Sequence, residues 1–427
     1  MGDSTKNIYV YADWAGLNNP HLMGTLTANQ IRGKEIFSFQ YADEWLKSGK
    51  AKILDPDLSL FSGFQHLRDE KLNFGMFLDS SPDRWGRVLM KRREIALAKQ
   101  ETRKAKTLFE SDFLLGVYDP LRMGGLRFKT DKDGDFLDND IHYATPPWTS
   151  IRELESASLE YEKGLEQDSP ELLKWLNMLY APGSSLGGAR PKANILDTDD
   201  SLWIAKFPSK NDDFNIGAWE MLANSLAKKA GINCAVGMVG KFNSQYHTYL
   251  TKRFDRDSDG KRIHFASAMT LLGYTDGIGA DEGVSYLELA EFIVKHGSNT
   301  NEDLKELFRR IAFSVCISNT DDHLRNHGFL LNDKGWTLSP AYDINPNPDG
   351  KGLKLNIDVD DNSLDLDLVL SVSDFFRLEK QEAQTIIEQT KNVVSNWRQE
   401  ANRYQISSSE QDRMENAFSA IDYRYKT

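Results

Sequence analysis

The sequence predicts an α+β fold with two lobes, in which β-rich and mixed segments come first and a mainly helical part follows. Short β-type runs at 7–12 and 37–41, and strands that alternate with a helix over 193–254, predict the first part. Long helical patterns after residue 255 predict the second. The 427 residues are enough for two or three domains. We expect a β-rich N-terminal subdomain at 1–115, an α/β lobe at 116–254 and a helical lobe at 255–427.

Composition and charge limit the possible functions. The net charge of −12 disfavours a protein that grips nucleic acid by itself, because such binding rests on basic side chains that neutralise phosphates. Contact with DNA through a basic partner stays open. With only Cys234 and Cys316, a disulfide framework is not expected and a reducing compartment fits. No apolar run reaches about 18–20 residues, and the start lacks an apolar signal region. We expect a cytoplasmic protein.

Two stretches in the first 140 residues carry local patterns. Residues 83–103 combine a helical pattern with many arginines and lysines. Both a solvated helix face and an interaction surface agree with this composition, and both alternatives stay open. Residues 123–128, followed by an Asp133-Gly134 turn, predict a local hairpin.

A glycine-rich loop lies between residues 181 and 192, ahead of two predicted strands at 193–196 and 202–208. Glycines let the backbone curl its N–H groups around phosphate oxygens, although a plain surface turn has the same composition. An inward-facing Lys206 on the second strand favours a site that covers and grips nucleotide phosphates. The candidate phosphate-binding residues of the loop are Gly183, Ser184, Ser185, Gly187 and Gly188.

A helix is predicted over 215–230, closed by Gly231 just past its end. Glu220 lies at the edge of its apolar stripe, 14 residues after Lys206. In a kinase, an acid on this helix pairs with the strand lysine and orients it. The alternative is a glutamate that faces solvent. Two more strands, 236–240 and 246–254, are predicted to lead to the hinge beside the nucleotide base.

The stretch from Asn319 to Asn345 holds an acid, an amide five residues later, and a second acid after a predicted hairpin. Asp321 and Asn326 have the Asp-x4-Asn spacing of a protein-kinase catalytic loop, and Asp343 follows the hairpin. In phosphoryl transfer one carboxylate orients the attacking hydroxyl and accepts its proton, while an amide oxygen and a second carboxylate hold Mg²⁺. The pattern predicts Asp321 as the base and Asn326 and Asp343 as Mg²⁺ ligands.

Neighbouring residues support this loop. A helix capped by Asp303 is predicted to deliver it from a rigid base. Asp322 is expected to pair with His327, and His323 either holds the backbone of the loop or handles a proton. Helical patterns at 379–398 and 408–424 are expected to brace the large lobe, without chemistry of their own.

The order of these features is more specific than any one of them. A glycine-rich loop, a strand lysine, a helix glutamate, an Asp-x4-Asn loop and a further acid indicate a nucleotide-dependent phosphotransferase with a kinase-like fold. Two alternatives remain: a kinase for a small molecule or a lipid, and a nucleotide-binding co-repressor without catalysis.

Five motifs together resemble the HipA family, the serine/threonine kinase toxins of bacterial toxin–antitoxin pairs. They are Ser184–Lys192, Trp203–Lys206, Lys252–Asp255, Asn319–Asn326 and Ser339–Asp343. The resemblance covers nearly the whole chain, and the catalytic loop is also similar to that of the lipid kinases. In place of the Asp-Phe-Gly of eukaryotic kinases the chain has Asp343-Ile-Asn, so switching of an activation segment is not assumed.

The resemblance implies cofactors, site residues and partners. ATP and Mg²⁺ would be the cofactors, with Lys206 on the phosphates and the 250–254 stretch, including Lys252 and Phe254, as the hinge. The family phosphorylates itself on a serine of the glycine-rich loop; Ser185 aligns with it, and Ser184 is an adjacent candidate. Its protein substrates include aminoacyl-tRNA synthetases. Its usual partner is a small helix-turn-helix antitoxin (HipB-like) that carries the main contacts to operator DNA.

Overall fold

The computed structural model describes residues 4–67, 71–140, 146–163, 176, 178–179 and 190–422. It divides into two compact units, each formed from two segments of the chain. Unit 1 comprises Met1–Asn211 and Lys252–Ala266, and unit 2 comprises Asp212–Thr251 and Ser267–Thr427. The three-part division expected from the sequence stays a prediction.

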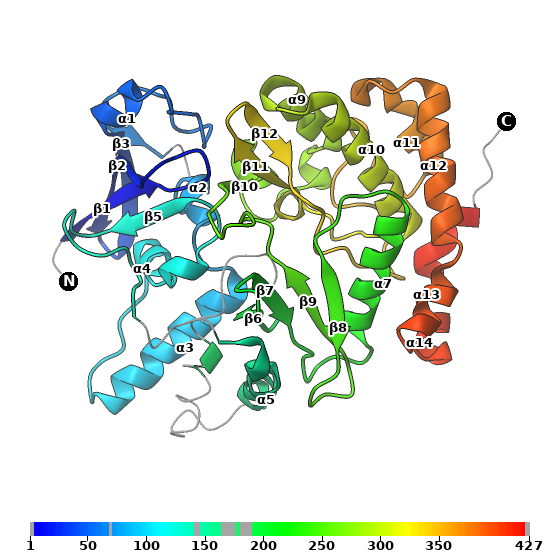
Figure 1. Ribbon diagram of the computed structural model, residues 1–427, viewed down its shortest axis with the longest axis horizontal. Helices are drawn as coiled ribbons and strands as arrows, with labels where there is room; N and C mark the ends of the chain where they lie inside the picture. The colour runs from blue at the N-terminus through cyan, green and yellow to red at the C-terminus, as the bar shows by residue number, and fades with distance from the viewer. Residues whose placement is uncertain are drawn as a thin grey trace. The chain divides into compact units, whose positions relative to one another are not determined.

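Unit 1 contains a five-stranded antiparallel sheet in the order β4-β3-β2-β1-β5 (Figure 1). Alternate residues of β1, among them Ile8 and Val10, are fully buried, as the two-residue period of a strand requires. The strands are β1 (Ser4–Ala12), β2 (His21–Ile31), β3 (Lys34–Tyr41), β4 (Gln65–His66) and β5 (Leu126–Lys129).

The hairpin predicted around residues 123–134 is wrong. Strand β5 pairs with β1 instead, with Val10 opposite Phe128. Leu126 and Phe128 are fully buried, so β5 completes the core face of the sheet at its β1 edge. Residues 135–140, after the Asp133-Gly134 turn, form no strand, although Leu137 N donates to the Phe128 carbonyl at 2.9 Å.

The described residues of unit 1 also form the helices α1 to α5. The first turn of α3 begins at Asp83, whose side chain accepts a hydrogen bond from Gly86 N at 2.9 Å. The same carboxylate lies 2.7 Å from Lys192 Nζ, and both side chains are almost fully buried. Trp85 Nε1 donates to the Lys192 carbonyl at 3.1 Å, so the start of α3 is fixed to Lys192 twice. The helices are α1 (Asp43–Lys47), α2 (Gly75–Leu78), α3 (Arg84–Gln100), α4 (Glu110–Leu115) and α5 (Ile151–Glu162).

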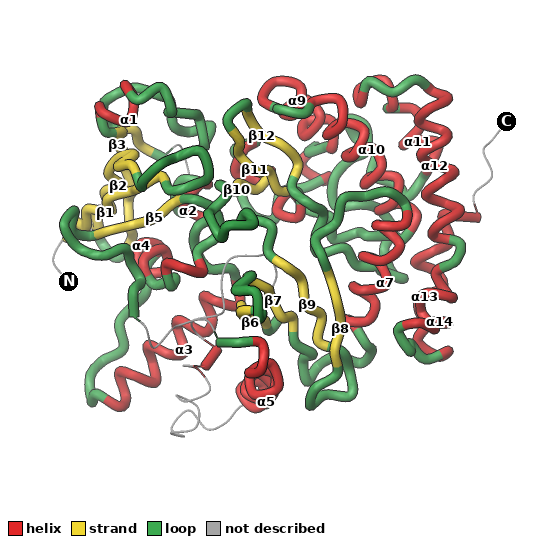
Figure 2. The backbone as a smooth tube through the Cα atoms, viewed as in Figure 1, coloured by secondary structure: helices red, strands yellow, loops and turns green. Residues whose placement is uncertain are grey.

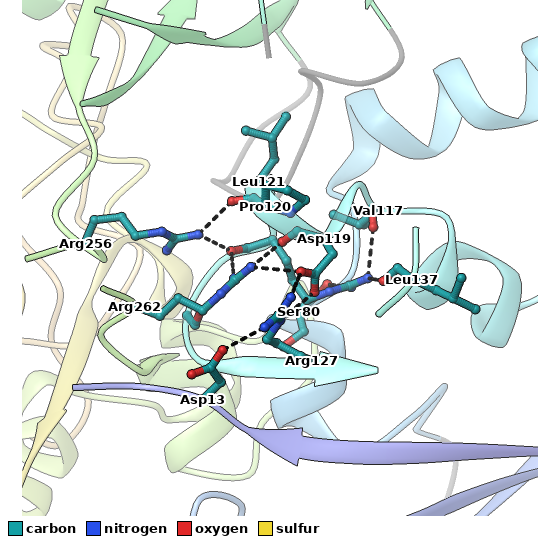
Figure 3. A network of polar contacts seen from close by, with 12 residues as sticks. Asp13, Ser80, Val117, Asp119, Pro120, Leu121, Arg127, Leu137, Arg256 and Arg262 are labelled. Carbon is teal, nitrogen blue, oxygen red and sulfur yellow. Dashed lines mark hydrogen bonds and ion pairs between the residues drawn. The ribbon is translucent and has the colours of Figure 1, made fainter. Parts of the chain in front are cut away.

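A buried network of arginines and aspartates ties distant segments of unit 1 together. Arg127 binds Asp13 at 2.9 Å and Asp119, while Arg262 and Arg256 donate to backbone carbonyls of the Asp119–Arg122 turn (Figure 3). Asp255 is fully buried and lies 2.6 Å from both Arg253 and Arg256. Burial alone would raise the pKa of Asp255, but these two guanidiniums hold it well below its ordinary value.

Residues 192–206 form the predicted hairpin. Strands β6 (Lys192–Leu196) and β7 (Leu202–Lys206) pair antiparallel across the Asp197–Ser201 turn. In unit 2, β8 (Gly237–Gly240) pairs with β9 (Thr248–Lys252), also antiparallel.

Helix α7 (Ile216–Lys229) confirms the helix predicted over 215–230. Asn215 caps it, and Gly231 follows with a φ of +86°, a conformation that glycine adopts without steric cost. Gly217 lies in its first turn against the β8–β9 connection. A Cβ at Gly217 would stand 2.2 Å from the His247 carbonyl oxygen.

We expect Gly217→Ala to destabilise the protein by about 1–3 kcal/mol, because the added methyl group meets backbone that cannot move aside. The direction of this change in the free energy of unfolding is informative, because a Gly-to-Ala substitution inside a helix normally stabilises a protein by about 0.5–1 kcal/mol. Urea unfolding followed by circular dichroism measures the change. Gly134→Ala is the matched control, because its nearest neighbour lies at an ordinary 3.4 Å. Equal stability of the two variants would contradict the prediction.

Unit 2 is mainly helical (Figure 2). Besides α7, its described residues form the helices α8 (Ala268–Leu271), α9 (Tyr286–His296), α10 (Thr300–Cys316), α11 (Leu366–Ser371), α12 (Lys380–Val394), α13 (Trp397–Arg403) and α14 (Ser408–Met414). Short 3₁₀ turns occupy Ala280–Glu282, Leu324–Asn326, Ser373–Phe376 and Glu415–Asp422. Strand β10 (Phe265–Ser267) crosses the boundary of the units, and β11 (Gly328–Asn332) and β12 (Gly335–Leu338) form the hairpin predicted after the catalytic loop.

Three helical details differ from the prediction. Asp303 does not cap α10, which begins at Thr300; its carboxylate accepts instead from Leu338 N at 3.1 Å and joins α10 to β12. The pattern at 379–398 is broken between α12 and α13, and α14 continues as a 3₁₀ helix. In the part of the chain that the structure describes, no helix is both long and apolar enough to cross a membrane.

Candidate active site

Asp321 and Asn326 lie in one short closed loop that follows α10. His323 N donates to the Asp321 carbonyl at 3.0 Å, and Asn326 N donates to the His323 carbonyl at 2.8 Å. The side-chain amide of Asn326 also donates to the Asp321 carbonyl, at 3.0 Å. The loop is therefore held by the backbone of Asp321 and His323, and the Asp321 carboxylate takes no part in closing it.

The side-chain oxygen of Asn326 is a candidate metal ligand. It is buried and accepts no hydrogen bond from any described residue, while the amide nitrogen of the same side chain is engaged by the loop. A buried polar atom without a partner needs an explanation, and Mg²⁺ prefers oxygen ligands of this kind. The residue that the sequence predicts as a Mg²⁺ ligand thus has an oxygen available for one.

The segment that carries Asp343 is hydrogen-bonded to residues in and next to this loop. Tyr342 donates its hydroxyl hydrogen to the Arg325 carbonyl at 2.6 Å, and Asn345 N donates to the side-chain oxygen of Asn319 at 3.3 Å. Asp343 has a φ of +57°, an uncommon conformation for a residue other than glycine. Such conformations are found preferentially at functional sites. The structure brings the Asp343 segment beside the loop of Asp321 and Asn326.

Asp322 supports the loop from inside the protein. It accepts from the Tyr286 hydroxyl at 2.7 Å and from Ser314 at 3.3 Å, and it lies 3.1 Å from His327 Nε2. Burial opposes ionisation, but the interactions with His327 and Tyr286 outweigh it and lower the pKa of Asp322. The expected pairing of Asp322 with His327 is confirmed. Asp322 is a buried support of the loop.

We expect the free energy of unfolding of Asp322→Asn to fall less steeply with decreasing pH than that of the wild type. The pKa of Asp322 is lower in the folded than in the unfolded chain, so the unfolded chain takes up this proton at a higher pH. The stabilisation from the ionised Asp322 is therefore present above about pH 4 and is lost as the pH falls. Urea unfolding at a series of pH values from 7 downward should show a steeper loss for the wild type. Asp281→Asn, an exposed control, should follow the wild type. Parallel curves for wild type and Asp322→Asn would contradict this role.

Glu220 does not face solvent. It is 4 % exposed, so the alternative of a surface glutamate is wrong. The buried hydroxyl of Tyr249 lies near it: burial, then the Glu220 carboxylate, and then Cys234 and Asp343 raise the pKa of Tyr249 well above its ordinary value. Glu220 and Asp343 therefore both lie near this hydroxyl. The sequence analysis did not single out Tyr249. In the structure its oxygen would lie 2.6 Å from a Cβ at Gly237, so this glycine leaves room for the hydroxyl.

Lys206, Lys252 and Phe254, predicted at the phosphates and at the hinge, belong to unit 1. Lys206 ends β7 opposite Lys192 and is half-buried. Lys252 is also half-buried, 3.5 Å from Asp199, and the Phe254 ring packs 6.1 Å from the ring of Phe265. The five candidates of the glycine-rich loop, Gly183, Ser184, Ser185, Gly187 and Gly188, lie outside the described residues.

The α+β fold and the Asp-x4-Asn loop together define a protein of the kinase-like class. Residues 184–397, half of the chain, match the family model of the HipA-like C-terminal domain. The chain belongs to this family.

Curated relatives and solved structures are similar to the chain. A "Putative kinase" of Haemophilus influenzae is 30% identical over 179 residues, which cover 38% of this chain and 52% of the relative. "Putative kinase Y4dM" of Sinorhizobium fredii is 28% identical over 156 residues, covering 33% and 36%. The chain thus spans about half the length of these relatives, or less.

The solved structure is from the Shewanella oneidensis MR-1 toxin–antitoxin complex of HipA, HipB and operator DNA. It matches with a TM-score of 0.62 and 17% identity, over 97% of this chain and 95% of that chain. The α+β fold of the HipA family, predicted from the sequence, is thereby confirmed.

Proposed function

We propose that this protein is an ATP- and Mg²⁺-dependent serine/threonine protein kinase, the toxin of a toxin–antitoxin pair. The observation that carries the proposal is the closed loop of Asp321 and Asn326 with the Asp343 segment fastened beside it. This arrangement supports the proposal, because its Asp321, Asn326 and Asp343 would provide the base and the two oxygen ligands that phosphoryl transfer needs. The names of the two curated relatives agree with a kinase.

Each predicted residue has a role in this proposal. The exposed Asp321 carboxylate would orient the attacking hydroxyl and accept its proton. The side-chain oxygens of Asn326 and Asp343 would hold Mg²⁺, which when bound neutralises charge on the phosphates. Lys206 would grip the phosphates, with Glu220 orienting it. Lys252 and Phe254 would border the nucleotide base at the hinge.

The glycine-rich loop supplies a means of self-inhibition. Phosphate on Ser185, or on the adjacent Ser184, would add nearly two negative charges where the phosphates of ATP are expected to lie. Repulsion would then expel the loop or the nucleotide and switch the kinase off.

The proposed partners follow from the family. The substrate is a translation-related protein of the aminoacyl-tRNA synthetase class, phosphorylated in the cytoplasm. A HipB-like helix-turn-helix antitoxin binds the chain and carries the main contacts to DNA. The net charge of −12 agrees with leaving these contacts to the partner, and the HipA–HipB–operator complex of the Shewanella relative is a precedent.

Intact-mass analysis of freshly dephosphorylated protein, incubated with Mg²⁺-ATP beside Asp321→Asn, tests the proposal. We expect the wild type to gain one phosphate that maps to Ser185, and the variant to gain none. ATP binding without any phosphate gain would favour the nucleotide-binding co-repressor. ATP turnover without a protein acceptor would favour a small-molecule or lipid kinase.

A further inference from the structure

Helix α3 exposes one basic face. The structure describes all of this helix. At 3.6 residues per turn, the exposed side chains from Arg84 to Lys99 all lie on one side of the helix, within an arc of about 100° around its axis. We call them the α3 basic face. They are Arg84, Val88, Lys91, Arg92, Ile95 and Lys99.

Four cations on one helix face are unusual in a chain whose net charge is −12. The opposite face of α3 is buried and includes Trp85, Leu89 and Met90, so the orientation of the helix is fixed. Two aliphatic side chains, Val88 and Ile95, lie among the cations and are 41% and 43% exposed. Aliphatic side chains add nothing to a helix face that contacts only water. A face that mixes cations with aliphatic side chains is suited to contact with a protein partner.

A pocket of about 330 Å³ lies at the first half of this face, lined by residues of α3, of the end of α5 and by residues 210–211. The rings of Trp85 and Tyr161 meet edge to face at 5.4 Å and line it. The Arg92 guanidinium stands over the Tyr161 ring at 4.8 Å. Arg84 and Lys210 add positive charge at the rim, and Glu162 adds one negative charge.

The Tyr161 hydroxyl points to the chemistry of the ligand. Tyr161 is only 3% exposed, and its hydroxyl finds no acceptor within the described ranges of the chain, although Arg92 lies close enough to donate to its oxygen. Burial raises the pKa of Tyr161 to about 12, although Arg92 opposes this, so the hydroxyl keeps its hydrogen and remains a donor. A buried donor in a cation-rimmed pocket lacks an anionic acceptor. A carboxylate from a partner supplies one.

We propose that the α3 basic face binds an acidic segment of a partner protein, with one carboxylate seated in the pocket against Tyr161 and Arg92. The aliphatic side chains of this segment pack on Val88 and Ile95. The face runs about 22 Å from Arg84 to Lys99 at 1.5 Å per residue, so the occupant is an elongated segment. Nucleic acid fits less well, because aliphatic side chains interrupt the row of cations that would neutralise its phosphates. The inference does not depend on phosphotransfer.

Fluorescence anisotropy with the full chain tests the proposal. The probe is a labelled peptide of about 15 residues with a repeating Glu-Glu-Leu sequence, long enough to follow the face as a helix. Arg92→Glu and Lys99→Glu should each weaken binding about tenfold or more, since each places a like charge against the peptide. Tyr161→Phe should weaken it about three- to tenfold by removing one buried hydrogen bond. A peptide of repeating Gln-Gln-Leu should not bind.

Lys104→Glu is the matched control, because it makes the same charge change at an exposed site outside the face. It should leave the affinity within about twofold of wild type. Circular dichroism confirms that each variant is folded. Equal weakening by Lys104→Glu, or wild-type affinity in Tyr161→Phe, would overturn the proposal. Tighter binding of a labelled DNA duplex than of the acidic peptide would also overturn it and assign the face to nucleic acid.

Discussion

Asp321→Asn is expected to slow phosphate transfer by about 10²- to 10⁴-fold, the usual contribution of a positioned general base. An amide cannot accept the proton of the attacking hydroxyl. The loop itself should survive, because its hydrogen bonds use the backbone carbonyl of Asp321 and not the carboxylate. The affinity for Mg²⁺-ATP and the melting temperature should therefore stay close to wild type. Single-turnover rates of phosphate incorporation, measured beside nucleotide titrations, separate the two effects.

The exposed Asp281 supplies a matched control for this substitution. Asp281→Asn makes the same chemical change on the surface of unit 2 and should leave the transfer rate unchanged. If Asp321→Asn transfers phosphate at the wild-type rate, the proton acceptor is another group. If it fails to bind nucleotide, the residue acts on binding and not on chemistry.

Asp255→Ala is expected to destabilise the protein by about 3–5 kcal/mol, because two buried guanidiniums lose their counter-ion. Arg253 is 4% exposed and Arg256 lies against it, so neither can turn to water without disrupting the core of unit 1. The backbone N–H of Gly124, which donates to Asp255 at 2.9 Å, loses its acceptor as well. Equilibrium urea unfolding of the full chain measures the loss.

Asp259→Ala, four residues along the chain and exposed, is the control and should change stability by no more than about 0.5 kcal/mol. A loss below about 1 kcal/mol in Asp255→Ala would mean that the backbone carbonyls around Arg253 and Arg256 hold these guanidiniums without the carboxylate. The prediction would then be wrong.

Local spacing explains why the closed loop of Asp321 and Asn326 could be predicted from the sequence. Asp321 and Asn326 are five residues apart in a turn that closes on itself, and the hairpin that follows has its turn residues in place. The cap of α7 and Gly231 were likewise predictable, because each depends on only a few neighbouring residues. Local patterns alone predict the fold only in outline, and the family resemblance made this prediction specific.

The remaining features depend on contacts between distant segments. Strand β5 pairs with β1 across more than a hundred residues, so its local sequence suggested the wrong partner. Tyr249, Glu220 and Asp343 come from a strand, a helix and a loop, and no spacing in the sequence relates them. The break between α12 and α13 lets Trp397 stack on Phe418, 4.3 Å away, which a helical period does not reveal.

The buried pair of Lys192 and Asp83 bears on how far the chain can be shortened. The family model begins at residue 184, which suggests that residues from 184 onward could be expressed alone. A chain cut there loses two contacts of Lys192, the first residue of β6: the ion pair with the Asp83 carboxylate and the hydrogen bond from the Trp85 indole. It also uncovers a side chain that is 2% exposed in the whole protein. A fragment that keeps these contacts has to start ahead of Asp83.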